Sequence, residues 1–101
     1  MKAALRYVHS AARELAELDQ RIRLVIVRDL RAIVRDPRRA PRELDVRRLD
    51  GYPGYWRLSA KKHRLIYHFD GTTVEVWFIE LRTSDTYDRL RELPNPHIPG
   101  T

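Results

Sequence analysis

Three arginines lie in or beside segments whose other residues are mostly apolar. Arg57 is inside residues 55–60, Arg64 is inside residues 63–69, and Arg82 follows residues 74–81. An arginine in a half-buried strand is costly unless it is paired or faces a polar ligand. Guanidinium groups from three neighbouring strands would form a compact anion site, because their planar N–H groups match phosphate oxygens. The residues alone leave an alternative of separate salt bridges, with partners Glu75, Glu80 and Asp85.

The distribution of charge also points to an anionic partner. The chain of 101 residues has a net charge of +6, but residues 21–64 hold 14 bases and five acids, a local balance of +9. A concentrated positive field suits a polyanion, because basic side chains replace the counterions condensed on phosphates. For five of these bases, an ordinary solvated helix face remains the alternative: Arg21, Arg23, Arg28, Arg31 and Arg35.

Other kinds of site chemistry have little support. The chain has no cysteine, which excludes disulfides, thiolate metal sites and cysteine nucleophiles. The four histidines lack the spacing of metal ligands; they are His9, His63, His68 and His97. Gly51 and Gly54 lie in a turn and do not open a helix, so no phosphate-binding loop is present. We expect neither a metal site nor a cofactor.

Two helices are expected to precede the arginine-bearing strands. Ser10 is placed to cap a helix over residues 11–18, and Asp19 to cap a second over residues 20–35. The second has apolar residues at helical spacing: Ile22, Val25, Ile26, Leu30, Ile33 and Val34. Asp36-Pro37 ends it, because proline disfavours helical geometry in the preceding residue. The two helices should form a hairpin.

The strand signals follow the helices, with one more at the start of the chain. Residues 3–8, 55–60, 63–69 and 74–81 read as strands, and Asp70-Gly71 predicts an antiparallel hairpin between the last two. Lys61-Lys62 is short enough for a second tight turn. A short final helix is expected from Ser84 to residue 93. We therefore predict an α+β fold, with the helical hairpin on a twisted antiparallel sheet of about four strands. Residues 1–93 form one domain and residues 94–101 a flexible tail.

The order of these motifs resembles the RelE/ParE toxin superfamily of bacterial type II toxin–antitoxin systems. The resemblance rests on Gly54-Tyr55-Trp56-Arg57-Leu58, then His63-Arg64-Leu65-Ile66-Tyr67, a hairpin, an apolar strand, and Arg82 followed by Tyr87. The helical hairpin, which ends in the loop that begins at Asp36-Pro37, also resembles that of the superfamily. The resemblance covers about residues 3–90, and the RelE/YoeB-like branch fits the central motif.

The resemblance to that branch implies a metal-independent mRNA endoribonuclease that acts on the ribosome. Arg57, Arg64, Arg82 and Tyr87 match its catalytic positions. RNA supplies its own nucleophile, the 2′-hydroxyl. The protein therefore needs only to orient the RNA, stabilise the negative charge of the transition state and transfer protons. Further basic residues are expected to bind the RNA: Arg47, Arg48, Lys61, Lys62 and His63.

The same resemblance leaves a different target open. ParE-like members share the fold but inhibit DNA gyrase, and Ser59 stands where RelE has a second basic residue. A glutamate expected in YoeB before the first core strand is absent, as is a histidine after the last strand. A basic nucleic-acid-binding module without catalysis is the third alternative. The resemblance also implies a cognate antitoxin, acidic and partly disordered when free. Because no apolar run approaches the ~20 residues that a membrane span needs, we expect a cytoplasmic protein with no membrane contact.

Overall fold

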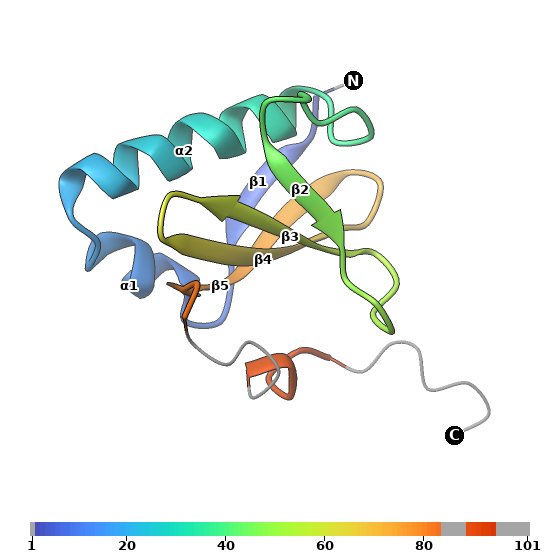
Figure 1. The fold of residues 1–101 in the computed structure, drawn as a ribbon. Helices are drawn as coiled ribbons and strands as arrows, with labels where there is room; N and C mark the ends of the chain where they lie inside the picture. The colour runs from blue at the N-terminus through green and yellow to red at the C-terminus, as the bar shows by residue number, and fades with distance from the viewer. Residues whose placement is uncertain (1, 84–88, 95–101) are drawn as a thin grey trace.

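The structure, a computed structural model, describes residues 2–83 and 89–94. Within them the chain forms, in order, β1 (Ala4–Tyr7), α1 (Ala11–Ala16), α2 (Gln20–Arg35), β2 (Asp45–Arg48), β3 (Tyr55–Ala60), β4 (His63–Phe69) and β5 (Thr73–Leu81). The five strands form one sheet in the order β1-β5-β4-β3-β2, with the two helices packed together on one face (Figure 1). The α+β class is confirmed.

The expected four-stranded antiparallel sheet is wrong in two respects. The sheet has a fifth strand, β2, and it is mixed, because β1 runs parallel to β5 with Leu5 opposite Val74. The sequence of β2 contains one apolar residue, Val46, and so lacks the alternation that identifies a strand. The pairing of β1 with β5 joins the two ends of the domain, which no local pattern encodes.

The helical hairpin forms as expected. The Oδ1 atom of Asp19 accepts a hydrogen bond from the Arg21 N–H at 2.8 Å, and α2 spans the predicted residues 20–35. The first helix ends at Ala16, two residues before its predicted end. Ser10 precedes this helix, but its side chain does not cap it. Its hydroxyl instead accepts a hydrogen bond from the Arg89 guanidinium at 3.0 Å.

The main core lies between the helices and the sheet. Ile26, Leu30 and Ile33 of α2 are fully buried and belong to one cluster with Leu58 of β3 and Leu65 of β4. Side chains of a strand alternate between faces, so their neighbours in sequence lie on the opposite side of the sheet. We call that opposite side the open face.

A β-bulge in β5 adds apolar surface to the open face. Ile66 pairs with Phe78 and Tyr67 pairs with Val76, so Trp77 is the extra residue in β5. Trp77 and Phe78 therefore both join the cluster on the open face, while Val76 and Ile79 belong to the helix side. The bulge explains why β5 looks apolar on both faces in the sequence.

A short C-terminal turn covers part of the open face. Leu90 and Leu93 are buried there in one cluster with Tyr55, Ile66 and Phe78. Hydrogen bonds from Glu92 to Arg89 and from Leu93 to Leu90 close the turn (orange-red in Figure 1). Residues 84–88, the first half of the expected final helix, lie outside the described residues. So does the expected tail, apart from Pro94.

Arg89 fixes this turn to the rest of the domain. Its guanidinium lies 2.9 Å from a Glu14 carboxylate oxygen and 3.0 Å from a Glu92 oxygen, and it stacks 4.3 Å from the centre of the Phe78 ring. Burial lowers the pKa of Arg89, but hydrogen bonds and charges from Glu92 and Glu14 outweigh it and raise the pKa. The Glu14 carboxylate also accepts a hydrogen bond from the Ile79 N–H of β5 at 2.8 Å. Arg89 thus connects α1, β5 and the C-terminal turn.

Candidate functional site

The strand register brings three of the expected arginines to the open face. Leu58 is in the helix-side core, so its neighbour Arg57 points the other way. Arg47 of β2 lies directly opposite Arg57. Arg57 in turn lies opposite Ile66 of β4, which places Arg64, two residues before it, at the diagonal position on the same face. We call Arg47, Arg57 and Arg64 the arginine face.

The opposed pair in the arginine face, Arg47 and Arg57, has little neutralising charge among the described residues. Among the described residues the Arg57 side chain forms no ion pair or hydrogen bond, and the Arg47 side chain has one exposed contact with Asp45 at 3.4 Å. Glu75, an expected salt-bridge partner, instead contacts Arg6 at 3.4 Å and His68 at 3.7 Å. Two like charges directly opposite each other destabilise a sheet. An anionic ligand lying over this face would remove that repulsion.

Arg64 and Arg82 meet at the end of the sheet where β3 turns into β4. The Arg64 guanidinium donates a hydrogen bond to the Arg82 carbonyl oxygen, and the Arg82 N–H donates to the Lys62 carbonyl at 2.7 Å. The Nε atom of Arg64 is buried and has no hydrogen-bond partner among the described residues. Glu80 is the cross-strand neighbour of Arg64.

The turn between β3 and β4 adds two more cations at this end. Lys61 and Lys62 form its two central residues, as expected, and Lys61 has a φ of 56°, a conformation that usually requires glycine. A hollow of about 470 Å³ is lined by Lys61, Lys62, Leu81, Arg82 and Thr83. Leu81 is 48% exposed there. The two lysines and Arg82 therefore surround one apolar patch beside the arginine face.

Two of the expected RNA-binding residues lie elsewhere. His63 pairs with Leu81 and is two residues before Leu65 of the helix-side core, so it points away from the arginine face. Its Nδ1 atom is buried without a hydrogen-bond partner among the described residues. Arg48 lies on the helix side, over the Trp56 ring at 5.3 Å. Tyr87, the fourth expected catalytic residue, lies outside the described residues.

The tyrosines of the sheet are poor proton acceptors. Burial raises the pKa of Tyr55, with a further contribution from the charge of Glu75, and burial alone raises the pKa of Tyr67. Both hydroxyls therefore stay protonated at neutral pH. Tyr55 lies on the open face, with its ring centre 4.7 Å from that of His68, and neither Tyr55 nor His68 was among the expected site residues.

No cluster of three metal-ligating side chains occurs in the described part of the chain.

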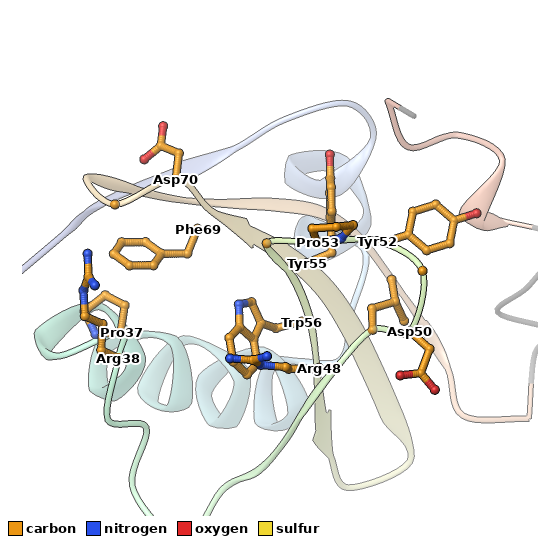
Figure 2. A pocket seen from close by; sticks show the side chains of 14 residues that line it. Pro37, Arg38, Arg48, Asp50, Tyr52, Pro53, Tyr55, Trp56, Phe69 and Asp70 are labelled. Atoms are coloured by element: carbon orange, nitrogen blue, oxygen red, sulfur yellow. The ribbon is translucent and has the colours of Figure 1, made fainter. Parts of the chain in front are cut away.

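A cleft of about 800 Å³ lies at the other end of β3. It is bounded by the loop after α2, by the turn between β2 and β3, and by the turn between β4 and β5 (Figure 2). Two arginines lie over aromatic rings in it: Arg38 is 5.8 Å from the Phe69 ring centre and Arg48 is 5.3 Å from that of Trp56. Of the expected site residues, Arg48 lines this cleft, and the cleft's other residues come from segments that are far apart in the sequence.

Comparisons with known proteins agree with the fold. The family described as the ParE toxin of the type II toxin–antitoxin system parDE matches residues 5–86. A free mutant of the Escherichia coli toxin RelE superposes with a TM-score of 0.73 at 20% identity, over 93% of this chain and 100% of that one. The RelB–RelE antitoxin–toxin complex of Methanococcus jannaschii gives 0.68 at 19% identity, over 83% and 96% of the two chains.

A third solved structure is the RelBE2 toxin–antitoxin complex of Mycobacterium tuberculosis, with a TM-score of 0.61 at 24% identity, over 83% of this chain and 95% of that one. No curated protein matches the sequence. No helix in the described residues is long and apolar enough to span a membrane. The family match extends over most of the chain, and the solved neighbours share its fold. The chain therefore belongs to the RelE/ParE superfamily and is the toxin of a type II toxin–antitoxin system.

Proposed function

We propose that this toxin is a metal-independent endoribonuclease that cleaves mRNA on the ribosome, in the cytoplasm. The arginine face carries the proposal. Arg47 and Arg57 are placed opposite each other without an acid between them, and Arg64 lies diagonally beside them. Such a surface is costly in the free protein and favourable against closely spaced phosphates. The turn of Lys61 and Lys62, which we call the lysine turn, and Arg82 extend the same positive surface past the end of the sheet.

The proposed reaction uses the nucleophile that RNA supplies. The 2′-oxygen attacks the adjacent phosphorus and loses its proton, while the bond from phosphorus to the 5′-oxygen breaks and that oxygen gains a proton. The products are a 2′,3′-cyclic phosphate and a 5′-hydroxyl end. Arg64 and Arg82 stabilise the extra negative charge on the phosphorane oxygens, and Arg57 orients the backbone.

The proposal assigns proton transfer or base stacking to Tyr87. A free tyrosine has a pKa of about 10, so this residue acts as a base only where its surroundings lower that pKa. Tyr55 and Tyr67 are unsuitable for this task, because burial raises their pKa values. Arg47, Lys61 and Lys62 hold the RNA backbone, and their loss should weaken binding more than chemistry.

The antitoxin is the partner that the proposal requires. The solved neighbours from Methanococcus jannaschii and Mycobacterium tuberculosis are toxin–antitoxin complexes. We infer a cognate antitoxin for this chain as well, acidic and partly disordered when free. The local balance of +9 over residues 21–64 favours such a partner through steering and complementarity.

Inhibition of DNA gyrase is the second candidate, and one observation favours it: the matching family is described as the ParE toxin. Ser59 also lies on the open face, opposite Arg64, where a second basic residue would strengthen an RNA site. Under this alternative the arginine face binds the target protein or its DNA without cutting RNA.

The test is induced expression in cells with mapping of mRNA ends and of DNA breaks. Cuts inside translated codons with cyclic phosphate ends support the nuclease, double-strand DNA breaks support the gyrase candidate, and neither supports a binding module without catalysis. Arg64→Ala should lower cleavage by about a hundred- to a thousand-fold, the usual cost of one charge stabiliser. Arg64→Lys should also lose most activity, because lysine lacks the bidentate fork. Arg91→Ala, an exposed arginine of the C-terminal turn, is the control.

A further inference from the structure

We propose that the cleft between Arg38 and Arg48 is an anchoring site for an extended acidic and apolar segment of the antitoxin. The inference rests on the antitoxin partner proposed above and adds its place of attachment. The cleft is bounded by the loop after α2 and by the turns on either side of the β3–β4 hairpin (Figure 2). Its volume of about 800 Å³ is in the range of ligand pockets, roughly 300–1,000 Å³.

Two arginines in the cleft are held in place but have no acidic partner. The guanidinium of Arg48 lies over Trp56 and that of Arg38 lies over Phe69. Stacking engages the face of a guanidinium and leaves the N–H groups at its edge available. Among the described residues neither Arg38 nor Arg48 forms a hydrogen bond or an ion pair. Each is therefore a preorganised receptor for one carboxylate, because ring contact restricts the side chain before binding.

The acids of the cleft distinguish a peptide from a nucleic acid. Asp50 and Asp70 line it together with the two arginines, so its formal charges balance. The Asp70 carboxylate accepts hydrogen bonds from the backbone N–H groups of Thr72 and Thr73, both at 2.8 Å. Because these bonds hold its pKa at about 2, Asp70 is anionic at every physiological pH. A continuous phosphate backbone would meet this charge, whereas a peptide can place its carboxylates at the arginines and other residues near Asp70.

The remaining walls suit apolar side chains. Trp56 and Phe69 are partly exposed, and Pro53 and Tyr55 also line the cleft (Figure 2). The turn before β3 is stiffened by hydrogen bonds from Tyr52 to Leu49 and from Leu49 to Tyr55. A cleft with fixed walls, aromatic surface and two isolated cations selects a segment in which acidic and apolar residues alternate.

The position of the cleft separates anchoring from inhibition. It lies at the Tyr55 end of β3, whereas the lysine turn follows Ala60 at the other end. At about 3.3 Å per residue, these ends are about 17 Å apart. A segment seated in the cleft therefore leaves Arg64 and Arg82 uncovered, and another part of the antitoxin must act there.

The experiment measures binding of the full-length toxin to the purified product of the antitoxin gene beside it. Arg38→Gln with Arg48→Gln removes both charges and keeps side-chain length. Since a hydrogen bond to a charged group contributes about 1.5–3 kcal/mol, each change should weaken binding by about tenfold or more. Arg21→Gln with Arg31→Gln is the matched control, on exposed positions of α2, and should change binding less than about threefold at physiological salt.

Fluorescence provides a second readout. The chain has two tryptophans, so Trp77→Phe leaves Trp56 as the only one, within the cleft. Antitoxin should change its emission, and the double glutamine variant should abolish that change at the same concentration. Circular dichroism establishes that each variant is folded.

The outcomes separate the two proposals. Equal binding by wild type and by the double glutamine variant overturns the cleft inference and leaves the toxin–antitoxin pairing intact. Absence of binding by the wild type, at low and at physiological salt, overturns both the inference and the proposed partner. A short oligoribonucleotide that shifts Trp56 emission only when Arg38 and Arg48 are present would make RNA the occupant, and would also overturn the inference.

Discussion

Replacing Arg57 by glutamine should stabilise the fold while it lowers toxicity. Arg57 lies directly opposite Arg47 and has no ion pair among the described residues. Directly opposed side chains have Cβ atoms about 5 Å apart. The Arg47 side chain is 71% exposed, so the dielectric of water applies, and two guanidinium charges held at that same spacing would repel each other by about 0.8 kcal/mol before salt screening. Screening at about 0.1 M salt reduces this to roughly 0.5 kcal/mol.

The assay is urea unfolding of purified wild type and Arg57→Gln. The variant should gain about 0.5 kcal/mol in the free energy of unfolding, or roughly 2–4 °C in melting temperature for a domain of this size. Added salt should stabilise the wild type more than the variant, because salt weakens the repulsion that only the wild type contains. Arg91→Gln, which has no cation opposite it in a strand, should show neither effect.

Activity is measured on the same preparations. If Arg57 is kept despite its cost because it binds phosphate, Arg57→Gln should cut RNA at least about tenfold more slowly than wild type. The reasoning is refuted if Arg57→Gln is less stable than wild type, since Arg57 would then make favourable contacts in the free protein. A stable variant with full toxicity would refute the assignment of Arg57 to the site.

Three further predictions concern the scaffold. Arg89→Met should lower the free energy of unfolding by about 1–3 kcal/mol, measured in urea, because it leaves the half-buried Glu14 carboxylate without its ion pair. Asp70→Asn should reduce the loss of unfolding free energy that the wild type shows in urea titrations as the pH is lowered below 4. The folded-state pKa of Asp70, about 2, is below its usual 3.8, so its contribution is present above pH 4 and is lost as the pH falls through about 2. Gly54→Ala should lower the melting temperature, because φ is +82° and a Cβ atom would lie 2.9 Å from His68 Nε2.

The helices and hairpins were predictable because their determinants are local. Apolar residues at helical spacing and the Asp19 cap define α2, and its predicted bounds are confirmed. Asp70-Gly71 and Lys61-Lys62 mark the two turns of the meander that links β3, β4 and β5. Motif order along these elements was enough to predict the superfamily, which the family match confirms.

The errors come from interactions between distant segments. The strand β2 has one apolar residue, Val46, and becomes a strand only because β3 offers it a free edge. The parallel pairing of β1 with β5 depends on the helical hairpin returning the chain to the far side of the sheet. The face on which His63 lies was also not evident from its residue type: the alternation within β4, fixed by Leu65 in the core, turns it to the helix side.

The candidate site was predictable in part for the same reason. Residue type identified Arg57 and Arg64 as unusual in apolar strands, but only the register shows that Arg47 faces Arg57 and that Glu75 is engaged by Arg6 and His68. The cleft was not predictable, since it depends on Arg38 from a loop reaching a ring that is far along the chain.

The opposed arginines, Arg47 and Arg57, and the stacked arginines, Arg38 and Arg48, suit different ligands. On the arginine face, two cations are forced together by the register, so their repulsion is removed only by a ligand with closely spaced negative charges, such as successive phosphates. In the cleft, each cation lies over its own aromatic ring and has no acidic partner among the described residues, which suits single carboxylates on a peptide. The proposed function uses both kinds of surface, because the proposed target is mRNA and the proposed inhibitor is a protein. Because the cleft lies at the Tyr55 end of β3 and the turn of Lys61 and Lys62 follows the Ala60 end, an antitoxin segment anchored in the cleft does not need to occupy the place proposed for RNA at Arg64 and Arg82.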